Sequence, residues 1–318
     1  MILSKTITVN FFISLFVSII FSVEYTDYEF EIFSLSIDAR TNSLGGIASS
    51  KSMSLDKVYS LNEFHKRGKS LFSYGESYSG IINYFQVSRI ILDSQKSRIG
   101  VSLLHKQIEN IHNTQDAWID LGHNINQSDI DYSNISSYSD QQISIILLYS
   151  YNSKIGDIGV KVKPFYTSVL EFNSLGFSID LGINRNFSDS LILGFSINNL
   201  LSVNKWSTGE VYSLYPGLSS LISYSNGKHL LMSELCISPS ESKDILLNSL
   251  YKIGYENNIY KKVKLQIGYS SIKSFSLGFS LDYKNKFFSY SFSPNFNNII
   301  LGHDHQFSIL LDLPNNLN

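Results

Sequence analysis

The sequence predicts an all-β protein: a transmembrane antiparallel β-barrel of about fourteen strands, preceded by a plug-like N-terminal segment. Three observations lead to this prediction. They are an export signal at the N-terminus, a two-residue alternation of apolar and polar side chains, and an apolar face almost free of charge. The chain then divides into a signal peptide over 1–22, a plug-like segment over 23–68 and a barrel over 69–318.

The composition of the 318 residues fits a membrane barrel. Charged residues make up 16% and aromatic residues 14% of the chain, against a typical charged share of about a quarter. The formal net charge of -2 gives no basic field for nucleic acid. The mean hydropathy of -0.00 is that of strands with one apolar and one polar face. The single cysteine, Cys236, excludes an internal disulfide and a multi-cysteine metal site.

The N-terminus reads as an export signal. Lys5 is the first charged residue, an apolar stretch covers 7–21, and Ser22 is a small residue suited to cleavage. The alternative is a membrane anchor, but the apolar stretch is shorter than the roughly 20 residues that a helical span needs. No later stretch approaches that length, so membrane insertion would depend on strands.

Alternation with a period of two dominates the chain after residue 70. Residues 275–283 place Phe, Leu, Phe, Leu and Tyr at alternate positions, with Ser, Gly, Ser and Asp between them. Most predicted strands have 8–13 residues, close to the roughly 9–11 that a tilted strand needs to cross a bilayer. The strands are predicted at 69–75, 80–90, 97–108, 141–151, 155–169, 173–185, 190–201, 214–225, 229–238, 247–257, 261–271, 274–284, 286–293 and 303–313.

The predicted connections alternate between short and long. Long loops are expected at 109–140, 202–213 and 239–246, whereas the links between them have one to four residues. Outer-membrane barrels have short periplasmic turns and long extracellular loops. Aromatic residues gather beside the short turns and predict an interfacial girdle there. They are Tyr149, Tyr151, Phe187, Tyr224, Tyr255, Tyr260, Tyr283 and Phe287.

A soluble β-sandwich is the competing fold, because it also alternates. Its water-facing side would carry Lys and Glu for solubility, whereas the polar face here is mostly Ser, Gly and Asn. The other face avoids charge, as expected where Lys or Arg costs about 2–4 kcal/mol at mid-bilayer. Both observations favour the membrane barrel.

Several segments resemble the PorV/PorQ family, relatives of the FadL-type outer-membrane transporters. Residues 38–46 (D-A-R-T-N-S-L-G-G) are similar to its A-R-x-x-x-L-G-G opening segment, although the Asn-Pro-Ala-Gly turn that should follow is reduced to Asn62. Residues 176–199 are similar to its G-x-x-x-D-L-G strand and the strand after it. Residues 205–209 resemble its W-x-T-G loop, and 301–310 resemble its final strand.

The resemblance implies a non-enzymatic protein of the bacterial outer membrane that assists protein secretion or surface attachment, as in type IX secretion. The implied partners are outer-membrane lipid and other envelope or secretion-system proteins. The alternative is a FadL-like transporter of hydrophobic small molecules, with an apolar pocket between residues 38–66 and the barrel wall. A purely structural barrel is a third possibility.

Charged residues at lumen-facing positions are the candidate site. Hairpin geometry predicts that Lys161 lies near Asp180. These charges could line a polar pathway or fill a closed lumen with ion pairs, and the sequence does not separate the two. The lumen-lining candidates are Lys161, Lys163, Asp180, Glu234, Lys264 and Asp282.

Candidates for partner contact are the aromatic residues Trp118, Tyr132 and Trp206, which fall in predicted long loops. His303 and His305, with the Asp304 carboxylate between them, could be two metal ligands, but no third ligand can be identified by spacing, so a polar loop is the simpler interpretation. None of the seven histidines lies in a nucleophile motif, and no phosphate-binding loop follows a strand. We therefore expect no catalytic residues, no metal and no cofactor.

Overall fold

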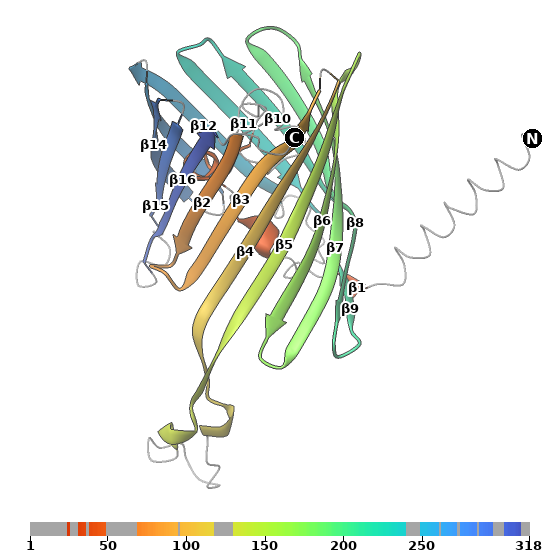
Figure 1. Ribbon diagram of the computed structural model, residues 1–318, viewed down its shortest axis with the longest axis vertical. Helices are drawn as coiled ribbons and strands as arrows, with labels where there is room; N and C mark the ends of the chain where they lie inside the picture. Colours follow the sequence, from red (N-terminus) through yellow and green to blue (C-terminus); the bar gives the residue numbers. More distant parts are fainter. Residues whose placement is uncertain are drawn as a thin grey trace, which may run out of the picture.

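The computed structural model describes most of the barrel and part of the N-terminal segment (Figure 1). The described residues are 24–25, 31–35, 38–48, 69–94, 96–117, 130–239, 249–260, 262–271, 274–284, 286–294 and 302–312. The predicted signal peptide, Trp118 and the turn at Asn62 lie outside these residues.

Fourteen antiparallel strands form a closed barrel, which confirms the predicted fold class. Each strand pairs with its neighbours in the chain, and β16 pairs with β2 to close the cylinder. The barrel strands are β2 (Lys69–Ser77), β3 (Ile82–Asp93), β4 (Ser97–Asn113), β5 (Ser136–Ser153), β6 (Gly156–Val169), β7 (Phe172–Asn186), β8 (Leu191–Trp206), β10 (Gly217–Ser225), β11 (His229–Ile237), β12 (Ser249–Tyr260), β13 (Val263–Ser270), β14 (Ser274–Tyr283), β15 (Lys286–Ser293) and β16 (Asp304–Asp312).

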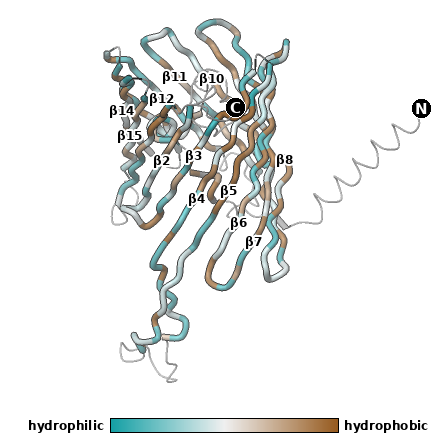
Figure 2. Tube along the Cα trace, viewed as in Figure 1, coloured by the Kyte–Doolittle hydropathy of each residue, from teal (hydrophilic) through white to brown (hydrophobic). Residues whose placement is uncertain are grey.

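Alternation sets which side chains face outward. In β5, Ile143, Ile145 and Leu147 are exposed, whereas Ser144 and Ile146 between them are buried inside the cylinder. Hydrophobic residues recur along the barrel strands in the same way (Figure 2). An exposed apolar surface of this extent is stable only against lipid, because water would penalise about 25 cal/mol for each Å². The outer face is therefore the membrane-contacting face.

The hairpin of β4 and β5 is longer than the sequence predicted. Beyond a bulge at Glu109 and Asn110, the ladder resumes with Ile111 opposite Tyr138 and continues to Asn113 opposite Ser136. The predicted loop 109–140 is therefore partly strand, and the hairpin projects well beyond the barrel (Figure 1). The bulge shifts the two-residue period, which is why alternation failed to reveal the extension.

Two short strands extend the sheet beyond the fourteen. β9 (Val211–Ser213) pairs with the end of β8, inside the predicted loop 202–213, and β1 (Glu24–Tyr25) pairs in parallel with β9. The remaining short elements are η1 (Glu31–Ser34), α2 (Ala39–Ser43), η2 (Gln115–Ala117) and η4 (Tyr132–Asn134). No helix among the described residues is long and apolar enough to cross a membrane.

Candidate functional site in the barrel lumen

An N-terminal segment, residues 38–48, lies inside the barrel and is called the plug here (Figure 1). All of its residues are buried except Gly46, which is half-buried. Asp38 caps the single turn of α2, accepting hydrogen bonds from the Thr41 backbone N–H at 2.9 Å and the Thr41 hydroxyl at 2.6 Å. Gly45 and Gly46 then turn the chain with φ of 74° and 76°, which glycine adopts without strain.

The barrel wall receives the plug in a groove formed by glycines of three neighbouring strands. Gly254 of β12 and Gly268 of β13 face the plug backbone between Ser43 and Gly45, and Gly278 of β14 faces the Ser43 side chain. A Cβ at Gly254 would lie 2.7 Å from the Leu44 carbonyl oxygen, and one at Gly268 would overlap the Gly45 nitrogen. A side chain at any of the three positions would collide with the plug, so this part of the wall is shaped to it.

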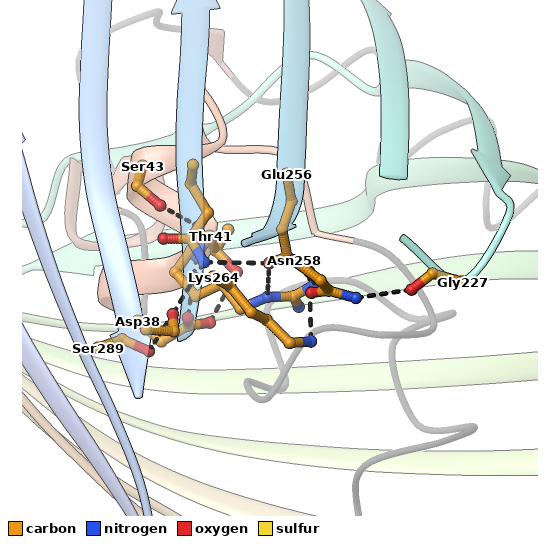
Figure 3. Close-up of polar contacts among 11 residues, drawn as sticks. Asp38, Thr41, Ser43, Gly227, Glu256, Asn258, Lys264 and Ser289 are labelled. Atoms are coloured by element: carbon orange, nitrogen blue, oxygen red, sulfur yellow. Dashed lines mark hydrogen bonds and ion pairs between the residues drawn. The ribbon is translucent and has the colours of Figure 1, made fainter. Parts of the chain in front are cut away.

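A buried ion pair fastens α2 to β12. The Arg40 guanidinium contacts the Glu256 carboxylate twice, with Nε 2.6 Å from Oε2 and Nη2 3.1 Å from Oε1. Lys264 and Gln266 of β13 also donate to this carboxylate, at 3.3 Å and 3.1 Å. Burial lowers the pKa of Arg40, but the Glu256 carboxylate outweighs it and the pKa is raised above its ordinary value. Figure 3 shows Glu256 and Lys264 beside the plug residues.

Serines of the wall satisfy the plug's backbone and amide groups. The Ala39 N–H donates to Ser308 Oγ at 2.8 Å, and the Asn42 side chain donates to Ser291 Oγ at 3.0 Å. The hydroxyl of Ser276 accepts from the Gly45 N–H at 3.2 Å and donates to the Ser43 carbonyl at 3.1 Å. These contacts give the buried polar groups of α2 the partners that burial demands.

The plug also makes an apolar contact inside the lumen. Leu44 and Ile47 form one buried cluster with Leu221 of β10 and Leu230 and Met232 of β11. This lumen cluster lies on the inner face of a wall that is otherwise rich in serine. Methionine adapts its shape readily, which suits a surface that repacks around different apolar groups.

Three of the predicted lumen-lining residues meet at one point of the wall. Lys161 and Lys163 of β6 lie 3.0 Å and 2.8 Å from the Asp180 carboxylate of β7, so the expected pairing of Lys161 with Asp180 is present. Asp180 also accepts a hydrogen bond at 2.9 Å from the backbone of Asn199, which lies in a bulge of β8 with φ of 52°. This cluster is buried, and Asp180 connects it to the backbone of the bulge.

The same cluster meets the N-terminal chain through η1. The Lys163 ammonium lies 4.6 Å from the centroid of the Phe33 ring, and Phe33 packs edge-on against Phe165 at 5.6 Å. Ile32 donates its backbone N–H to Gln142 of β5 at 3.1 Å. The N-terminal segment therefore contacts both sides of the lumen, at β5–β6 through η1 and at β12–β16 through the plug.

The other three lumen candidates lie in different environments. Glu234 is buried and pairs with Lys252 at 3.1 Å, and Lys252 donates to the Gly46 carbonyl of the plug at 3.1 Å. Lys264 is partly buried beside Glu256. Asp282 is exposed at the short-turn end of β14, so its position is a rim and not the lumen interior.

The predicted partner-contact residues are only partly described. Tyr132 is 60% exposed near the tip of the projecting hairpin. Trp206 is half-buried at the end of β8, where its backbone N–H donates to the Glu210 carbonyl at 2.9 Å. His305 hydrogen-bonds Tyr290 at 2.7 Å, and the described residues contain no group of three or more side chains able to hold a metal ion.

Arg40, Glu256 and the three groove glycines were missed as site residues. Arg40 is one charge in a segment of small residues, and a signal for the groove was available in the glycines at Gly254, Gly268 and Gly278. The pairing of Arg40 with Glu256 spans 216 positions and leaves no local pattern in the sequence.

Asp180→Asn should destabilise the barrel by about 2–3 kcal/mol, because the buried ammonium groups of Lys161 and Lys163 lose this charged acceptor. The measurement is the urea midpoint of unfolding in lipid vesicles. Asp282→Asn, at the exposed rim, is the matched control and should stay within about 0.5 kcal/mol of wild type. Equal midpoints for the two variants would show that the cluster adds nothing to stability.

Comparison with solved structures shows which known proteins share this fold. No protein-family model and no curated protein matches the sequence. The toluene transporter TodX of Pseudomonas putida aligns at a TM-score of 0.57 and 12% identity, covering 86% of this chain and 96% of its own. The toluene transporter TbuX of Ralstonia pickettii gives 0.55 and 10%, covering 91% and 97%. The monoaromatic hydrocarbon channel CymD gives 0.53 and 10%, covering 86% and 95%.

At these identities the likeness establishes the fold alone. The similar structures are FadL-like transporters and channels for hydrophobic molecules, and they are not enzymes. They give no evidence for the PorV/PorQ family, which the segments at 38–46 and 176–199 had suggested. The FadL-like part of that resemblance agrees with these structures, and the PorV/PorQ assignment stays a prediction.

Proposed function

We propose that this protein transports small hydrophobic molecules across a bacterial outer membrane, through a barrel that its own N-terminal plug obstructs. The barrel and the similar hydrocarbon transporters support this proposal over a role in protein secretion. The secretion role depends on the sequence segments alone, and the contacts of the plug do not call for a protein partner.

The observation that carries the proposal is the lumen cluster. A pore for ions and sugars needs polar walls, yet here Leu44 and Ile47 of the plug pack on three apolar wall residues. An apolar solute that reaches this contact gains about 25 cal/mol for each Å² of its surface removed from water. The cluster therefore offers a binding site inside the barrel that favours hydrophobic molecules over hydrophilic solutes.

Uptake of radiolabelled toluene by cells tests the proposal, in a host without its own hydrocarbon channel. Leu230→Gln/Met232→Gln should lower protein-dependent uptake at least about fivefold. An apolar solute that binds here would bury the two amides without hydrogen-bond partners, and this would weaken its binding by about 1–3 kcal/mol for each amide. Leu231→Ala changes an outward-facing side chain of the same strand and should leave uptake unchanged. Immunoblots of isolated outer membranes establish equal amounts of folded barrel.

Two results would count against transport. Wild-type cells taking up toluene no faster than cells with the empty vector would exclude this probe as a substrate. Unchanged uptake by the double glutamine variant would exclude the lumen cluster as the binding site. If a secreted protein is recovered in complex with the barrel and toluene uptake is not above the empty-vector level, the secretion role would be favoured.

A further inference from the structure

The two rims of the barrel carry opposite exposed charge. One rim consists of the short turns at 94–96, 154–155, 187–190, 226–228, 261–262 and 284–285. Each of these turns has an exposed Lys or Arg in it or within two residues of it. Among the residues that the structure describes, these exposed cations are Lys96, Lys154, Arg185, Lys228, Lys262, Lys284 and Lys286. We call them the rim cations.

Few carboxylates balance the rim cations. Among the described residues, the same rim exposes Asp189, Asp282 and Asp312. The described part of the opposite rim exposes the single cation Lys205 together with Glu109, Asp116, Glu171 and Glu210. Among the described residues, exposed positive charge therefore gathers at the rim formed by these six turns, and exposed negative charge gathers at the opposite rim.

The rim cations lie where the lipid-facing surface ends. The ammonium of Lys284 lies 5.1 Å from the centroid of the Tyr283 ring and that of Lys262 lies 6.0 Å from it. Arg185 lies 5.3 Å from the ring of Phe187 in the same way. Tyr283 and Phe187 are exposed residues of the outer face. Aromatic rings of this kind mark the level of the headgroups, so the cations lie at the depth of lipid phosphates.

We propose that this rim binds the phosphate headgroups of anionic phospholipids in the leaflet that it contacts. The cations occur at all six turns of this rim, so the positive charge encircles the barrel. A soluble partner would cover one sector, whereas a lipid annulus contacts the whole circumference. A surface of anionic lipid attracts Lys and Arg side chains that lie near it, and these long side chains reach headgroups while their stems stay on apolar surface. The inference is independent of the molecule that the barrel transports.

The test measures which lipids stay with the full-length protein. The barrel is reconstituted in vesicles of equal parts phosphatidylglycerol and phosphatidylcholine and extracted in mild detergent. The retained lipids are then quantified by mass spectrometry. Wild type should retain phosphatidylglycerol about fivefold or more over phosphatidylcholine. Lys154→Gln/Lys228→Gln/Lys262→Gln/Lys284→Gln should return the ratio to that of the vesicles.

Two controls separate headgroup binding from general effects. Lys205→Gln removes an exposed cation from the opposite rim and should keep the enrichment. Replacing the same four lysines by arginine preserves the charge and should also keep it. A wild-type ratio equal to that of the vesicles would overturn the proposal. This result is expected if the rim cations bind an acidic soluble partner and not lipid. Full enrichment in the four-glutamine variant would overturn it as well.

Discussion

Gly268→Ala should convert a barrel that is blocked by its plug into one that conducts ions. The added Cβ would overlap the backbone nitrogen of Gly45, and backbone cannot rotate away as a flexible side chain can. Overpacking of this kind costs about 1–3 kcal/mol even where neighbours relax, so the plug should leave its groove for part of the time. In planar bilayers the variant should show stepwise openings.

Gly217→Ala is the matched control for this experiment. Gly217 is also a barrel glycine, but the nearest atoms to its added Cβ are 3.7 Å away, an ordinary contact distance. This variant should be as silent as wild type. If Gly268→Ala is equally silent, and its plug resists protease as the wild-type plug does, then the glycine groove does not position the plug.

Arg40→Met should loosen the plug without changing the wall. The substitution removes the guanidinium that contacts the Glu256 carboxylate at 2.6 Å and 3.1 Å. Breaking a buried ion pair by removing one partner costs about 3–5 kcal/mol. Hydrogen exchange of the amides of residues 38–48 should therefore accelerate by about two to four orders of magnitude, since each 1.4 kcal/mol is a factor of ten.

The double variant Arg40→Met/Glu256→Gln distinguishes the ion pair from the shape of the segment. The introduced amide leaves no buried charge opposite the methionine, and its oxygen can still accept from Lys264 and Gln266, so the exchange rate should return most of the way to wild type. Equal acceleration in the single and double variants would mean that Arg40 acts through packing. Wild-type exchange in the single variant would mean that other contacts hold the plug.

The strands were predictable because each face of a barrel strand meets one uniform environment. Residues 275–283 alternate without exception, and β14 lies within one residue of the predicted span. The pairing of Lys161 with Asp180 was predictable for the same reason, since adjacent strands joined by a tight turn fix the register. Prediction failed at the bulge after Ile108, where the period shifts and polar residues extend the hairpin.

The plug was predictable as a segment but not as a set of contacts. The D-A-R-T-N-S-L-G-G run that suggested a family lies inside the lumen, so this pattern reflects a structural role. Its partners Glu256, Gly268 and Ser308 come from three strands more than 200 residues away. Closure of the barrel brings them to the plug, and closure is a property of the whole sheet that no local pattern records.

The conductance of the wild-type protein in planar bilayers tests the central claim most directly. With the plug docked on the wall from β12 to β16, the account predicts that the purified protein inserts without current steps, while cells that express the same protein take up toluene. Steady openings of the unmodified protein, of the size expected for an empty fourteen-strand cylinder, would contradict it.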